Sequence, residues 1–205
     1  METHRALLVF AASDDPGAPY DPDTQVAAAA NGTLPVFWCM AFARGDVRTV
    51  TATREADADA AGDRGQGSPR VLTYPVLIAP LVEARRRAAW RRDLLYSILP
   101  CALESLYDDW LALLDSADAK ATPYLLTDLA GFAAALGPGD LDELVGAAMR
   151  AVSDDVLEDW DVLLAQAGIN LEGASRRVSF EDDDPLTVAA RLRGDRWVRP
   201  VPWGV

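Results

Sequence analysis

The chain has 205 residues, of which 32 are acidic and 19 basic, so its formal net charge is −13. Half of the residues are hydrophobic, which excludes the disordered class and is enough to bury a sizeable core in one domain over residues 1–205. A strongly acidic surface repels phosphate, so the charge excludes nucleic-acid binding over the whole surface and favours a basic protein partner.

The first third of the chain predicts a small sheet. Residues 5–12, RALLVFAA, form a short apolar run that is typical of a buried strand. Residues 46–53 are rich in β-branched side chains and residues 71–79 form another apolar run, so we expect two further strands. The segment QVAAAA after Thr24 predicts a helix, and the segment TLPVFWCMAF fits either a helix or a strand.

A segment of small and charged residues separates the second and third of these expected strands. Residues 54–69 contain three glycines, many charges and no apolar side chain larger than alanine. Such a segment has little to bury, so we expect a mobile loop.

Helical periodicity begins at residue 81. We expect helices over residues 81–99, 101–117 and 123–137, with Pro100 ending the first. Asp140 and Glu143 form a capping box before the next helix, and Ser153 is expected to cap a last one that Gly168 ends. About five main helices predict a helix-dominated α+β domain with a small sheet.

The C-terminal segment changes character again. Residues 175–192 fit a strand, an acidic turn and then a second strand or short helix. Residues 195–205 are too rich in proline for a central strand, so we expect an extended tail. Its Trp197 and Trp203 can anchor the tail on the body or serve as exposed anchors for a partner.

Five arginines fall within eight positions, at 85, 86, 87, 91 and 92. On a helix they do not share one face, which weakens a nucleic-acid interpretation. Spacing allows pairs of Glu83 with Arg87 and of Arg86 with the ring of Trp90.

Arg91 is the informative member of this run. It shares a helical face with Ala84, Ala88 and Leu95, so we expect it to be buried and paired with a carboxylate. The candidate carboxylates are those of Glu104, Asp108, Asp109 and residues 181–184. A different interpretation is that Arg85, Arg91 or Arg92, together with Asp108, lines a pocket for an anionic ligand or substrate.

Several kinds of catalytic and metal-binding chemistry need histidines or cysteines that this sequence does not provide. His4 is the only histidine, which excludes histidine-dependent triads and histidine-based zinc sites. Cys39 and Cys101 have neither metal nor redox spacing, so we expect reduced core thiols.

Carboxylates can bind metal ions, but their pattern here favours other roles. The run 181–184 is interpreted as a solvated turn, and the acidic residues at 154, 155, 158 and 159 as helix caps and surface groups. We therefore expect no metal and no cofactor. The sequence has no signal-peptide pattern and no membrane span, which predicts a cytoplasmic protein without membrane contact.

The order of TLPVFWCMAF, a charged helix and TPYLLTDLAGF resembles uncharacterised small bacterial proteins that are encoded beside polymorphic toxins as immunity proteins. The resemblance implies an acidic cytoplasmic binding protein without catalytic residues. The first hypothesis is therefore a non-catalytic module that binds a basic protein, such as a toxin domain. The alternatives are a small-ligand binder or enzyme built on the arginines, and a structural dimeric subunit; the sequence leaves the oligomeric state open.

Overall fold

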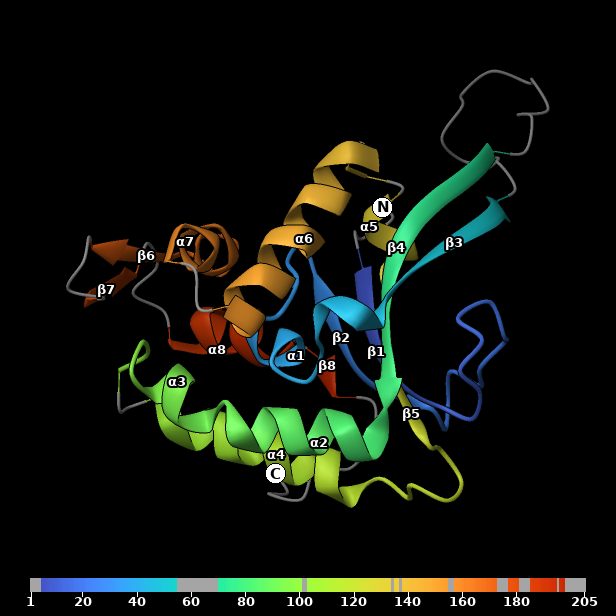
Figure 1. Cartoon of the computed structure of the whole chain (residues 1–205), viewed down its shortest axis with the longest axis horizontal. Helices are drawn as coiled ribbons and strands as arrows, with labels where there is room; N and C mark the ends of the chain where they lie inside the picture. The colour runs from blue at the N-terminus through green and yellow to red at the C-terminus, as the bar shows by residue number, and fades with distance from the viewer. Residues whose placement is uncertain are drawn as a thin grey trace.

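A six-stranded antiparallel sheet forms the centre of the fold (Figure 1). The computed structural model describes residues 5–54, 70–100, 103–133, 135–136, 138–154, 157–172, 177–180, 185–194 and 196–197. In sheet order the strands are β3 (Val47–Arg54), β4 (Arg70–Pro80), β5 (Tyr124–Asp128), β1 (Arg5–Ala11), β2 (Val26–Asn31) and the two-residue β8 (Arg196–Trp197). β6 (Ile169–Glu172) and β7 (Arg177–Phe180) form a separate hairpin.

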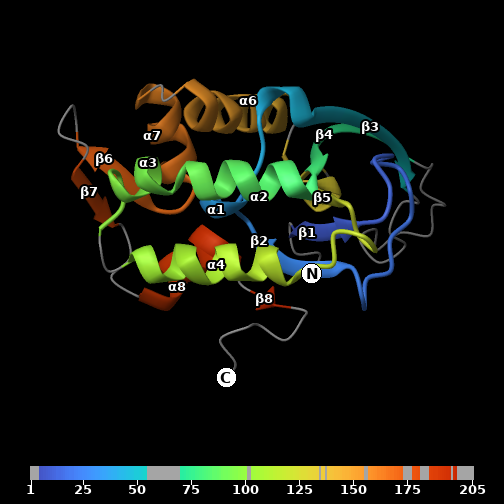
Figure 2. The ribbon, with the colours of Figure 1, turned by 60° about the horizontal axis from the view of Figure 1, so that its bottom comes forward.

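The helices gather at one side of the sheet in Figure 1. The longer ones are α2 (Leu81–Trp90), α4 (Glu104–Ser116), α6 (Pro138–Asp154), α7 (Leu157–Ala165) and α8 (Pro185–Arg193). Short turns of helix are α1 (Val36–Cys39), η1 (Arg44–Asp46), α3 (Arg92–Tyr96) and α5 (Ala130–Ala133). Figures 1 and 2 show α2 and α4 running side by side, with α6 on the other side of α2. None of the described helices is both long and apolar enough to span a bilayer.

The predicted fold class, a helix-dominated domain with a small sheet, is wrong. The expected strands at 5–12, 46–53 and 71–79 are found as β1, β3 and β4. However, β2 and β5 were expected to be helical, and they are the two neighbours of β1 in the middle of the sheet. The fold is therefore mixed α+β, with a sheet as its centre.

β2 is an alanine strand, against the helix propensity of alanine. The four residues at 27–30 are buried, and the strand pairs with β1 on one side and β8 on the other. Small side chains suit this position because the end of α8 comes very close: a Cβ on Gly194 would lie 3.0 Å from the Ala29 carbonyl oxygen. The ladder with β1 and the shorter pairing with β8 outweigh a propensity difference of about 0.7 kcal/mol per residue.

β5 occupies the first part of the segment 123–137 that was expected to be one helix. Leu125, Leu126 and Thr127 are buried between β1 and β4, which both pair with this strand. Only the single turn α5 follows it. A short apolar run has no decisive period, so its long-range partners determine its conformation.

The helical region differs from expectation mainly at its boundaries. The helix expected over 81–99 breaks at Arg91, whose ψ of 3° separates α2 from α3. α4 carries the expected apolar stripe, including buried Trp110, Leu113 and Leu114. α6 begins before the predicted cap Asp140 and continues through Ser153, which therefore does not cap the next helix.

The structure describes only part of the C-terminal segment for which the sequence made predictions. Of the alternatives for 175–192, the chain forms β7 and then a helix, α8. Arg196 and Trp197 form the edge strand β8 opposite β2, while the rest of the tail 195–205, including Trp203, lies outside the described residues. The expected loop 54–69, Cys101 and the acidic run 181–184 also lie outside them, apart from the strand residue Arg54.

A buried aromatic cluster joins the helices that carry the candidate site. The rings of Phe37 in α1 and Tyr107 in α4 meet edge to face at 5.0 Å, and Tyr107 stacks on Trp110 at 5.4 Å. The Tyr107 hydroxyl donates to the Ala88 carbonyl of α2 at 2.8 Å, and burial raises the pKa of this hydroxyl. The cluster therefore fixes α1, α2 and α4 relative to one another.

We predict that Gly131→Ala destabilises the protein, whereas Gly139→Ala does not. A Cβ at Gly131 in α5 would lie 2.4 Å from the Arg5 carbonyl oxygen, so α5 and β1 must separate, at a cost of about 1–3 kcal/mol. Gly139 in α6 has open space around it, so alanine there should be neutral or stabilising. Urea unfolding measures both, and equal stability of the two variants would contradict the close contact of α5 with β1.

Candidate functional site

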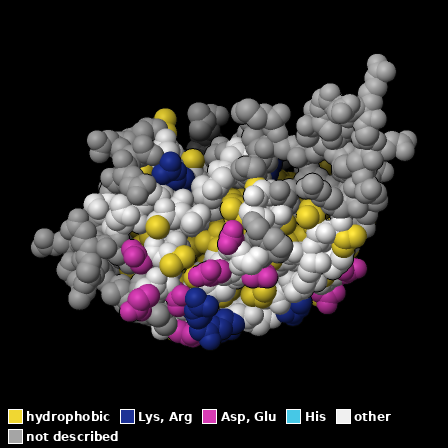
Figure 3. All heavy atoms as spheres, turned by 90° about the horizontal axis from the view of Figure 1, so that it is seen from above, with side chains coloured by type: hydrophobic (Ala, Val, Ile, Leu, Met, Phe, Trp, Pro, Cys, Tyr) yellow, Lys and Arg dark blue, Asp and Glu magenta, His cyan; other side chains and the backbone are white. Residues whose placement is uncertain are grey.

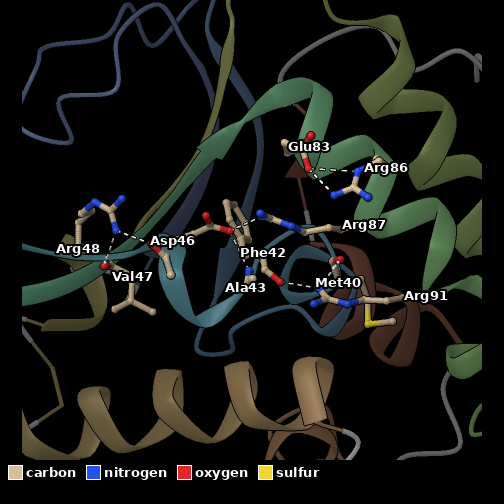
Figure 4. A network of polar contacts seen from close by, with 11 residues as sticks. Met40, Phe42, Ala43, Asp46, Val47, Arg48, Glu83, Arg86, Arg87 and Arg91 are labelled. Carbon is tan, nitrogen blue, oxygen red and sulfur yellow. Dashed lines mark hydrogen bonds and ion pairs between the residues drawn. The ribbon is translucent and has the colours of Figure 1, made fainter.

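The arginines of α2 and its C-terminal end are held by different partners (Figure 4). The buried stripe Leu81, Ala84 and Ala88 fixes the rotation of α2 against the body. The arginines between and after these positions therefore project to the two sides of the stripe and outward. Together with Trp90, three of these arginines line a hollow at the surface.

Arg91 is buried, as predicted, but its partner is not a carboxylate. The side chain is only 5% exposed, and its Nη1 donates to the backbone carbonyls of Met40, at 2.8 Å, and Phe42. These carbonyls directly follow α1, so Arg91 satisfies acceptors left free where that helix ends. Burial lowers the pKa of Arg91, and the charge of Arg87 lowers it further.

Arg87 forms an ion pair, but its partner is not the residue that the helical spacing predicted. It pairs with Asp46 of η1, whose carboxylate also accepts the Ala43 N–H at 2.8 Å. Glu83 was expected to bind Arg87 but binds Arg86 instead, with an N···O distance of 2.6 Å, and this contact lowers the pKa of Glu83. The expected stacking of Arg86 on Trp90 is therefore replaced by an exposed ion pair.

Arg85 and Arg92 serve the packing of α4. Arg85 donates to the carbonyls of Leu114 and Ala117, both at 2.7 Å from Nη2, and thus caps the C-terminal end of α4. Arg92 binds Asp108 at 2.7 Å, and both contact the hydroxyl of Tyr96. Arg92 and Asp108 are thus a mutual pair at the junction of α3 with α4.

The hollow is lined by Arg86, Arg87, Trp90 and Arg91 and has a volume of about 310 Å³. Arg91 and Arg87 are anchored below it, while the Trp90 side chain is 81% exposed at its rim. Three arginines and an indole combine donors for an anion with a flat surface for an apolar group. The hollow therefore brings an exposed indole together with three arginines whose guanidinium groups already have partners.

Of the sequence-predicted site residues, the described part of the structure brings Arg92 and Asp108 together as an ion pair but places neither of them at the hollow. Of Arg85, Arg91, Arg92 and Asp108, only Arg91 lines the hollow. Trp197 lies in the edge strand β8, and Trp203 lies outside the described residues.

Arg86, Arg87 and Trp90 were not predicted as members of a site. The sequence feature that could have identified them is a tryptophan on the side of an amphipathic helix opposite its apolar stripe. Trp90 was interpreted only as a ring for Arg86 to cover.

Two of the acidic residues that were weighed as metal ligands, Asp154 and Asp159, take part in ion pairs, whereas Asp155 and the run 181–184 lie outside the described residues. Asp159 accepts both Nε and Nη2 of Arg150, at 3.0 and 2.6 Å, which ties α7 to α6. Asp154 pairs with Arg44. Within the described residues no cluster of three potential metal ligands occurs.

No protein family, curated protein or solved structure matches the chain.

We predict that Asp46→Asn destabilises the protein by about 2 kcal/mol, because it leaves the half-buried Arg87 without its counter-ion. Glu83→Gln removes a carboxylate from an exposed pair and should leave stability unchanged within error. Urea unfolding of the two isosteric variants measures the difference. Equal effects would contradict the structural role assigned to the pair of Arg87 with Asp46.

We predict that the thiol of Cys39 is unreactive in the folded protein. Cys39 is buried in α1, and burial raises its pKa to about 12, although the charge of Arg91 acts in the opposite direction. The neutral thiol is the form that folding favours, so ionisation above the ordinary pKa of about 8.5 should progressively cost stability. A thiol reagent at pH 8, applied to a Cys101→Ser variant, should label Cys39 only after denaturant is added; labelling of the folded protein would contradict its burial.

Proposed function

We propose that the protein is a non-catalytic binding module for a basic protein, and that the exposed face of α2 is its docking surface. The observation that carries the proposal is a row of exposed side chains on this helix. Val82, Arg86 and Trp90 follow one another at intervals of four residues, so they share one face. Their exposed fractions are 62% for Val82, 81% for Trp90 and 71% for the Arg86 side chain.

The exposure of Trp90 supports a role in binding rather than in folding. Trp38, Trp110 and Trp160 are fully buried, which is how this chain uses tryptophan for stability. Trp90 leaves most of a large apolar ring in water, a cost that burial under a partner removes. Tryptophan and arginine are also the residues most often found at energetic hot spots of interfaces.

The charge of the chain supports a basic partner. The net charge is −13, and six arginines of the described residues lie within 4 Å of a carboxylate. Figure 3 shows acidic side chains spread over the face seen from above, with basic side chains between them rather than in one basic patch. Such a surface attracts a positively charged protein over distances of about a Debye length.

A basic toxin domain is one partner that carries the required positive charge, in line with the resemblance to immunity proteins. Inhibition by such a module needs affinity and no catalytic group. A cytoplasmic location is part of the same proposal.

We predict that Trp90→Ala weakens capture of the partner by about 30-fold or more, because it removes a central aromatic anchor. The bait is the whole chain, applied to an extract of the source cell, and bound proteins are identified by mass spectrometry. We expect a protein with an isoelectric point above about 9 that wild type retains and Trp90→Ala loses. Its association rate should fall about tenfold or more between low and physiological salt.

A matched pair of valines provides the control. Val82 lies on the proposed face and Val71 lies on β4, with similar exposed fractions of 62% and 66%. Val82→Ala should weaken binding, and Val71→Ala should not. If no salt-sensitive basic protein depends on Trp90, or if the two valine variants behave alike, the docking surface is wrong.

A further inference from the structure

β3 is an open edge of the central sheet. It pairs with β4 over residues 47–54 without a bulge, and no strand of the described residues pairs with its other side. The opposite edge is closed, because β8 pairs with β2 and the alanines at 27–30 are buried. Apart from Arg48 and Arg54, β3 lacks the proline, bulge or charge that commonly keeps an exposed edge from pairing.

Pro75 shows which backbone groups of β3 are free. Proline has no N–H, so its pair with Thr49 cannot be one in which the two residues exchange hydrogen bonds. The N–H and C=O of Thr49 therefore point away from β4, and those of Thr51, two residues on, do the same. No backbone hydrogen bond from the described residues reaches them. These two residues offer two donors and two acceptors to another strand.

The apolar side of the sheet is only half covered at β3. Val50 and Ala52 lie on the same side of the sheet as buried Tyr74, and both pack on the core but remain partly exposed. Figure 1 shows β3 extending away from the helices. A further strand beside β3 would therefore bury apolar surface as well as pair the free backbone groups.

We propose that this strand is β3 of a second copy of the chain, paired antiparallel about a two-fold axis at Val50. In this register Thr49 exchanges both hydrogen bonds with Thr51 of the second copy, and the symmetry repeats the exchange. Val50 then lies opposite Val50 of the second copy, and Arg48 lies opposite Ala52. The edge is thus complementary to itself.

The neighbouring registers are less favourable. An axis at Thr51 would place Arg48 opposite Arg54 of the second copy, and like charges directly opposite one another destabilise a sheet. An axis at Thr49 would need the C=O of Val47, which already accepts a hydrogen bond from Nη1 of Arg48 at 3.0 Å. The axis at Val50 avoids both problems.

The size and charge of the contact determine its expected strength. β3 has eight residues, fewer than the about 20–30 residues a side of a standard interface, so we expect a reversible dimer with a Kd of about 0.1 mM. Each copy has a net charge of −13, so the copies repel each other at low salt. Salt should therefore strengthen this contact, whereas it should weaken capture of a basic protein. The inference does not rest on the proposed function.

Analytical ultracentrifugation of the whole chain tests the dimer. The average mass should rise from that of one copy towards that of two between about 10 µM and about 1 mM protein. The dimerisation constant should increase about threefold or more when NaCl is raised from about 50 mM to about 500 mM. A strict monomer at about 1 mM protein in the higher salt would overturn the proposal.

A proline variant tests the role of the free backbone. Thr51→Pro removes an N–H that points to the second copy and leaves the ladder with β4 intact, so dimerisation should weaken about tenfold or more. Thr51→Val is the matched control, because it keeps the N–H and both variants lose the 3.2 Å contact between the hydroxyls of Thr51 and Thr73. Urea unfolding verifies that both variants fold.

Equal dimerisation of the proline and valine variants would contradict the strand pairing. A monomer that captures a different protein only when the Thr51 N–H is present would assign the edge to that protein and overturn the second copy as its occupant.

Cross-linking tests the register. In a Cys101→Ser background, Val50→Cys places two thiols opposite each other across the axis, in the type of antiparallel pair whose side chains are closer. Ala52→Cys lies on the same side of the sheet but places its thiols four residues apart along the strands. Mild oxidation should link Val50→Cys about tenfold faster or more, and buried Cys39 does not compete. Equal rates for the two variants would refute the axis at Val50, and with it the proposal.

Discussion

The contact of Arg91 with the carbonyls of Met40 and Phe42 fixes the arrangement on which the candidate site depends. It joins the end of α2 to the segment between α1 and η1, and Arg87 adds a second contact to the same segment through Asp46. Hydrogen bonds from a charged donor contribute about 1.5–3 kcal/mol each, and this gain has to offset the desolvation of a buried guanidinium. Two carbonyls offset only part of this cost, because neither of them carries a full negative charge.

The short, β-branched or apolar runs of β1, β3 and β4 could be predicted because their local pattern agrees with their final state. β2 could not, since alanine favours helix by itself, and only the pairing with β1 and β8 and the close approach of Gly194 explain the strand. β5 is a similar case, because both of its partner strands lie more than forty residues away in the chain. Long-range pairing determined the elements that local propensity misassigned.

The candidate site was predicted with the same mixture of success and failure. Helical spacing was enough to show that Arg91 faces the body, because burial follows from the apolar stripe. The choice of its partner was wrong, because backbone carbonyls at a helix end leave no mark in the sequence, whereas carboxylates do. Trp90 was not predicted as a site residue for a related reason: whether a ring on the polar side of a helix is covered depends on distant elements, and none of the described elements covers it.

An acidic exterior and a cationic hollow are compatible because they act over different distances. The excess negative charge of the chain is spread over its surface, and at physiological salt each charge is screened beyond about 8 Å. This field governs how a partner approaches. The arginines that line the hollow act over a shorter range, because Arg86 and Arg87 are each paired with a carboxylate. The same helix can therefore carry arginines beside its exposed row without reversing the long-range attraction of the chain for a basic protein.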